Sequence, residues 1–155
     1  MKIERRRRVW ALALLLLGAW VPAWTFGPVD RASSTRGEVT NIRTGRHAGY
    51  DRVVFDLSGY AMTEYHVRYI AQAAECGSGN TVNTGNQRLL EVHFPQAEAH
   101  SAPTLLTPNY PQVKVVRTIC DFEGHVNVFL GLAGHKRFRV QERHNPLRLV
   151  VDVQH

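Results

Sequence analysis

A short stretch in the first third of the chain carries five polar or aromatic side chains that could bind an anion or a sugar. They are Arg46, His47, Tyr50, Asp51 and Arg52. Arginine offers planar donors to carboxylate or phosphate groups, and tyrosine offers a stacking face. The stretch therefore predicts a binding loop. The alternative is a structural turn in which Asp51 accepts hydrogen bonds and holds a hairpin together.

Other reactive residue types lack the spacing of a catalytic or metal site. The chain has no Gly-x-Ser-x-Gly and no His-Glu-x-x-His motif. His66, His93 and His125 occupy outward positions of predicted strands and could share a sheet face, but a metal needs about three converging ligands. We predict no enzyme activity, no metal and no cofactor. A hydrolase remains an alternative, because sequence cannot show two carboxyl groups, such as those of Asp121 and Glu123, facing each other across a groove.

Aromatic usage argues against a deep sugar-binding groove. The three tryptophans, Trp10, Trp20 and Trp24, lie in or beside the N-terminal leader. Tyrosines such as Tyr50 are therefore the expected stacking faces. Glycan binding, if it occurs, is expected to be shallow and weak.

The first 23 residues have the pattern of a secretory signal peptide. Basic residues precede a leucine-rich apolar run, and Val21-Pro22-Ala23 offers a cleavage site. The alternative is an uncleaved membrane anchor. This leader holds five of the 19 basic and one of the 13 acidic residues, so without it the net charge falls from +6 to +2. We therefore expect no nucleic-acid partner.

The two cysteines, Cys76 and Cys120, both lie in the part predicted to be exported. An even number of cysteines in an oxidising compartment predicts one disulfide between them. The alternative is two separate free thiols.

Alternating apolar residues predict about eight short strands, bounded by glycine, proline and polar turn residues. Residues 24–37 are rich in turn formers and predict a flexible linker. The proline-rich stretch 95–111 leaves room for at most one helical turn, near 97–99. Together these features predict an all-β fold, either a two-sheet β-sandwich or a partly open barrel. The predicted strands are 38–43, 52–57, 64–70, 88–94, 112–120, 125–132, 137–143 and 148–153.

Two motifs resemble the AMIN-like domain family of secreted actinobacterial proteins. The first is Gly-Arg-His-x-Gly-Tyr-Asp-Arg-Val-Val-Phe at 45–55, and the second is Pro-Leu-Arg-Leu-Val-Val-Asp-Val at 146–153. The resemblance covers roughly 38–155, which would be the domain, and it implies a β-sandwich. The family takes its name from the N-terminal domain of cell-wall amidases. That relation implies a non-catalytic module that binds peptidoglycan or places an enzyme at the envelope.

We therefore predict a secreted, extracytoplasmic module that binds peptidoglycan or another wall polymer. Its surface would include the five residues named at the outset, joined by Arg68 or Arg139. The alternative is an interaction module that docks an envelope protein. Contact with a membrane is expected only if the leader is not cleaved.

Overall fold

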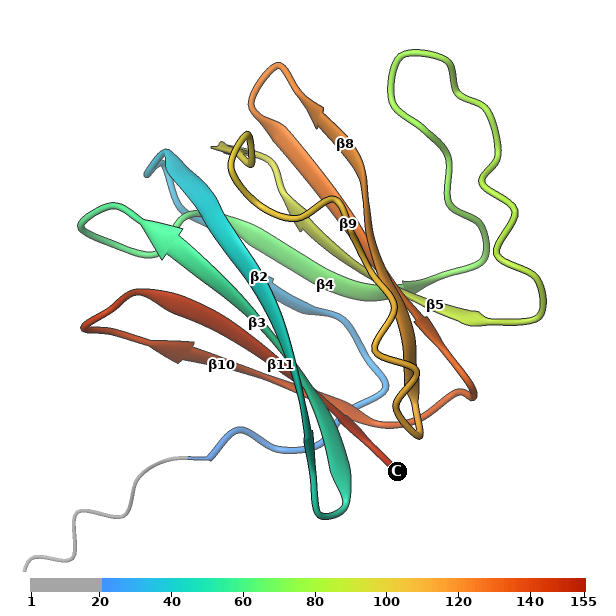
Figure 1. Ribbon diagram of the computed structural model, residues 1–155. Helices are drawn as coiled ribbons and strands as arrows, with labels where there is room; N and C mark the ends of the chain where they lie inside the picture. Colours follow the sequence, from blue (N-terminus) through green and yellow to red (C-terminus); the bar gives the residue numbers. More distant parts are fainter. Residues whose placement is uncertain (1–20) are drawn as a thin grey trace, which may run out of the picture.

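Two β-sheets, antiparallel apart from one short parallel pair, face each other in the computed structural model, which describes residues 21–155 (Figure 1). The predicted all-β sandwich is confirmed, and the sheets do not close into a barrel. Within the described residues there is no helix long and apolar enough to cross a membrane. The predicted signal peptide lies mostly outside them. The strands are β1 (Val29–Arg31), β2 (Gly37–His47), β3 (Tyr50–Ser58), β4 (Tyr65–Ile70), β5 (Arg88–Phe94), β6 (Ala97–Glu98), β7 (Leu105–Leu106), β8 (Val113–Phe122), β9 (His125–Leu132), β10 (Phe138–Arg143) and β11 (Arg148–Gln154).

One sheet has the order β10-β11-β3-β2-β6, and the other has the order β1-β4-β5-β9-β8-β7. The period-2 alternation of each strand sends its apolar side chains into the space between the sheets. Val53, Phe55 and Leu57 of β3 point inward as predicted, and all three are buried. Phe55 meets Phe94 of the opposite sheet edge to face, with ring centroids 5.5 Å apart. The two sheets therefore share one core.

Three strands, β1, β6 and β7, arise where the sequence showed no alternation. The segment 24–37 contains β1, which pairs with β4, and Thr25, which forms an isolated bridge to Phe138. This segment therefore packs on the sandwich, whereas the sequence predicted a flexible linker. The expected helical turn near 97–99 is wrong: β6 occupies that place and pairs with β2. Strands of two or three residues are too short to show a period of two in the sequence. They form because a neighbouring strand offers hydrogen-bond partners.

The polar stretch 45–52 is a tight hairpin and not a loop. β2 continues to His47, and β3 begins at Tyr50, so the turn consists of Ala48 and Gly49 alone. Gly49 has φ 85°, a conformation that glycine adopts without steric cost. Because these side chains sit on strands, they alternate between the two faces of the sheet.

The predicted disulfide between Cys76 and Cys120 is present, with the two Cα atoms 5.2 Å apart. It fastens the long loop between β4 and β5 to β8. The backbone of Glu75 also bonds to that of Asn80 within this loop. The disulfide lies on the six-stranded sheet, away from the hairpin.

Candidate binding surface

The outer face of the five-stranded sheet carries its polar side chains in rows, because residues directly opposite on paired strands share a face. The strand registers give three such rows across β10, β11, β3 and β2. The first row is Arg139, Asp152, Arg52 and Gly45; the second is Gln141, Val150, Val54 and Arg43; the third is Arg143, Arg148, Asp56 and Asn41.

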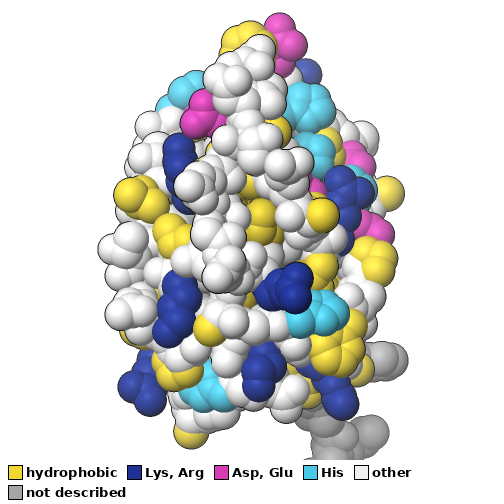
Figure 2. Space-filling model, turned by 90° about the vertical axis from the view of Figure 1, so that its right-hand side faces the viewer, with side chains coloured by type: hydrophobic (Ala, Val, Ile, Leu, Met, Phe, Trp, Pro, Cys, Tyr) yellow, Lys and Arg dark blue, Asp and Glu magenta, His cyan; other side chains and the backbone are white. Residues whose placement is uncertain are grey.

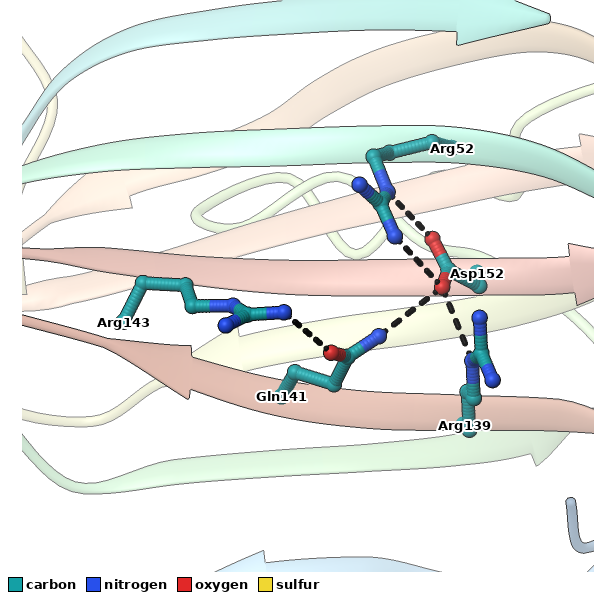
Figure 3. Close-up of polar contacts among 5 residues, drawn as sticks. All are labelled: Arg52, Arg139, Gln141, Arg143 and Asp152. Carbon is teal, nitrogen blue, oxygen red and sulfur yellow. Dashed lines mark hydrogen bonds and ion pairs between the residues drawn. The ribbon is translucent and has the colours of Figure 1, made fainter. Parts of the chain in front are cut away.

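Asp152 is the centre of this face (Figure 3). Its carboxylate accepts two hydrogen bonds from Arg52, at 2.6 and 2.9 Å, and one from Arg139 at 2.9 Å. Gln141 donates a fourth at 2.9 Å and accepts in turn from Arg143. Asp152 is 0% exposed although it points away from the core, because these side chains cover it. The bond to Asp152 raises the pKa of Arg52.

An aromatic group lies beside this network, at the hairpin end of the sheet. We call Trp24, His47, Tyr50 and Arg139 the aromatic shelf. The ring of Tyr50 stacks on His47 with centroids 4.7 Å apart, and its centroid is 6.1 Å from that of Trp24. The Arg139 guanidinium lies over Trp24 at 4.4 Å and over Tyr50 at 5.2 Å. These contacts hold flat faces and a cation in fixed positions.

Charge is unevenly distributed over the face of the molecule that Figure 2 shows. In the view of Figure 2, the charged side chains of the lower half are Lys and Arg, while the acidic side chains lie in the upper half. The hairpin tip lies at the lower end of the molecule in Figure 1, which has the same vertical axis. Figure 2 faces the side that lies to the right in Figure 1, so this distribution describes the surface around the six-stranded sheet and not the aromatic shelf.

Asp51 faces the interior, one residue away from the shelf. It is 0% exposed and accepts hydrogen bonds from the backbone N–H groups of Gln112 and Val113, at 2.7 and 3.0 Å. The ring of His155 is 2.9 Å from its other oxygen. Asp51 thus connects the hairpin to the start of β8 and to the C-terminal residue, and the structural alternative describes it better than a binding role.

Replacing Asp51 with alanine is expected to cost about 2–3 kcal/mol of unfolding free energy, because two buried N–H groups lose their acceptor. Asp51→Asn retains an acceptor oxygen and should lose less than half as much. Urea unfolding of the two variants would measure this. An Asp51→Asn protein as unstable as Asp51→Ala would show that the charge matters, and not the acceptor.

The predicted site residues separate into three groups. His47, Tyr50 and Arg52 lie on the outer face, and Arg139 joins them. Arg46 is opposite Asp51 in the register and so shares the other face, exposed at the hairpin tip. Arg68 lies on the other sheet and pairs with Glu91 at 3.0 Å.

Sequence analysis did not predict Trp24 as part of the binding surface, because this residue adjoins the leader. Its neighbour Thr25 bridges Phe138, and this bridge places Trp24 next to Arg139. No periodic pattern in the sequence signals that pairing.

The three outward histidines do share a face of the six-stranded sheet, as expected. His66 is directly opposite His93, and a ring nitrogen of His93 is 3.2 Å from one of His125. His66 also contacts the carboxylates of Asp30 and Glu64. Burial lowers the pKa of His93. Among residues 21–155, no group of three or more His, Cys, Asp or Glu side chains has the arrangement to hold a metal ion.

The fold and surface define a β-sandwich with a polar, arginine-rich outer sheet face. A family model, that of the AMIN-like domain, matches residues 37–155, and the chain belongs to this family. No curated protein and no solved structure matches the chain.

Proposed function

We propose that this domain is a non-catalytic module of the cell envelope that binds peptidoglycan through the aromatic shelf. The AMIN-like family suggests a cell-wall-related module. The leader pattern and the disulfide both favour an extracytoplasmic location.

The observation that carries the proposal is the close contact of aromatic rings with a guanidinium on an outer sheet face. Trp24 and Tyr50 are only partly buried, so part of each ring reaches solvent. Flat apolar faces can contact the C–H surface of a sugar ring, and Arg139 can donate to its hydroxyl or carboxylate groups. The shelf is open and not a deep pocket, which fits a ligand presented as a long polymer.

The test is co-sedimentation of the domain with purified peptidoglycan from which phosphate-containing polymers have been removed. Tyr50→Ala should weaken binding about tenfold, which is what losing an aromatic contact of about 1.4 kcal/mol would produce. Arg46→Ala should have a smaller effect, because its side chain lies on the other face of the hairpin. Tyr60→Ala is the matched control, since Tyr60 is 92% exposed and lies beyond the other end of β3.

Thermal unfolding of each variant would show that the fold is retained. Pelleting that survives Tyr50→Ala would exclude the shelf as the site. If the unmodified domain does not pellet even at low salt, where charge contacts are strongest, peptidoglycan binding is rejected. Capture of an envelope protein would then favour the docking alternative, and release of soluble wall fragments would favour the hydrolase.

A further inference from the structure

A second feature of the same sheet face lies one row further from the hairpin. Four arginines surround a shallow groove of about 350 Å³ whose floor is Val54 and Val150. We call this the arginine groove; its guanidiniums belong to Arg43, Arg52, Arg143 and Arg148. None of them is one of the four shelf residues, but the Arg52 guanidinium lies over the Tyr50 ring at 5.3 Å, so the groove and the shelf adjoin each other there.

Two of the four arginines are held by aspartates. Arg43 donates to both oxygens of Asp56 at 2.7 Å, and Arg52 donates to both oxygens of Asp152. Each guanidinium has five N–H groups, so both arginines keep donors that these bonds do not use. The aspartates fix the orientation of these side chains without neutralising the groove.

The other two arginines are directly opposite each other, Arg143 on β10 and Arg148 on β11. Arg143 donates to Gln141, and Arg148 donates to the carbonyl oxygen of Pro146. Neither forms an ion pair with an acidic side chain of residues 21–155. Like charges directly opposite on neighbouring strands destabilise a sheet. Asp56, directly opposite Arg148 on β3, offsets part of this repulsion, and an oxyanion between the two arginines would remove the rest.

We propose that the arginine groove binds the phosphodiester groups of an anionic wall polymer. The proposal shares the envelope setting of the proposed function but does not depend on peptidoglycan binding. Four arginines against two aspartates leave the groove positively charged, so the complementary ligand is an anion.

The distribution of the arginines points to a chain and not to a single ion. Arg52 lies in the first row and Arg148 in the third, so their Cα atoms are separated by about 13 Å along the strands. A polymer with repeated charges would contact both, and its aliphatic links would lie over Val54 and Val150. A phosphodiester has its charge within the chain, with two free oxygens that can each accept hydrogen bonds from a different guanidinium. That matches guanidiniums on opposite sides of the groove.

The experiment is calorimetric titration of the domain with poly(glycerol phosphate), and separately with poly-glutamate of the same charge number. The test variant is Arg143→Gln/Arg148→Gln. The matched control is Arg88→Gln/Lys114→Gln, which removes the same charge from the six-stranded sheet. We expect the test variant to bind poly(glycerol phosphate) at least tenfold more weakly and the control less than twofold. In the test variant, the slope of log affinity against log salt should fall by about 1.5.

Equal losses in the two variants would overturn the proposal, since binding would then follow net charge alone. Equal affinity for poly-glutamate would overturn the choice of phosphodiester, and no binding at low salt would overturn the site. Melting temperatures of both variants would show that each is folded. Tyr50→Ala separates the two functions: it should lose phosphate-free peptidoglycan and keep poly(glycerol phosphate).

Discussion

Replacing Asp152 with alanine is expected to lower the free energy of unfolding by about 3–5 kcal/mol, the usual cost of removing one partner from a buried ion pair. The carboxylate is fully buried, and it neutralises Arg52 and Arg139, whose side chains are 25% and 15% exposed. Without it, two largely covered guanidiniums would repel each other, and Gln141 would lose its acceptor. Chemical unfolding in urea would measure the loss.

Asp56→Ala is the matched control on the same face. Asp56 also holds an arginine by two hydrogen bonds, but Arg43 is 49% exposed, and such pairs contribute about 0–1 kcal/mol. The bond from Arg43 lowers the pKa of Asp56, so the contribution is present near neutral pH and declines as the pH falls. Similar losses in the two variants would contradict a special role for burial at Asp152.

The same substitution should also disturb the aromatic shelf. Asp152 fixes Arg139, and Arg139 lies over the rings of Trp24 and Tyr50. In conditions where Asp152→Ala remains folded, we expect weaker binding to peptidoglycan, although Asp152 itself is covered and touches no ligand. Asp152 is therefore a positioning residue in this proposal.

Removing the disulfide is expected to cost up to about 4 kcal/mol. The cysteines are separated by 44 residues, and the chain-entropy model gives that figure for a loop of this length. The bond restricts the unfolded chain and joins the loop after β4 to β8. The double variant Cys76→Ser/Cys120→Ser should unfold at lower urea than the oxidised protein.

Reduced wild-type protein is the natural control, because it keeps both cysteines. Its unfolding midpoint should match that of the double variant, and the variant should not respond to reductant. An oxidised protein no more stable than the reduced one would refute the prediction. Polymer binding should survive in the folded variant, because the disulfide lies on the other sheet from the aromatic shelf and the arginine groove.

The local pattern of the chain was sufficient for most of the regular strands. β5 and β9 have the predicted bounds, because each is a run of alternating residues closed by turn formers. The inward positions of Val53, Phe55 and Leu57 also follow from the period of two. β2, β8 and β11 continue past the predicted C-terminal ends of these strands, because hydrogen bonds to neighbouring strands extend a strand beyond its apolar residues.

Only some residues of the candidate site could be predicted from the sequence. Composition identified the arginines and Tyr50, and the motif identified the family. The sequence alone determined the all-β class and the resemblance to AMIN-like domains, since these rest on local periodicity and a linear motif. The count of two cysteines predicted a disulfide but left two free thiols as the alternative, and the structure decided between them.

Only the tertiary structure decided which of these side chains act together. A two-residue turn fixed the register that turns Asp51 inward and Tyr50 outward, and one residue of slip would exchange them. Asp152 and Arg52 are 100 residues apart, and Trp24 reaches Arg139 through a single bridge. Such contacts depend on which strands pair, and pairing depends on the burial of the whole core, which no local segment of the sequence encodes.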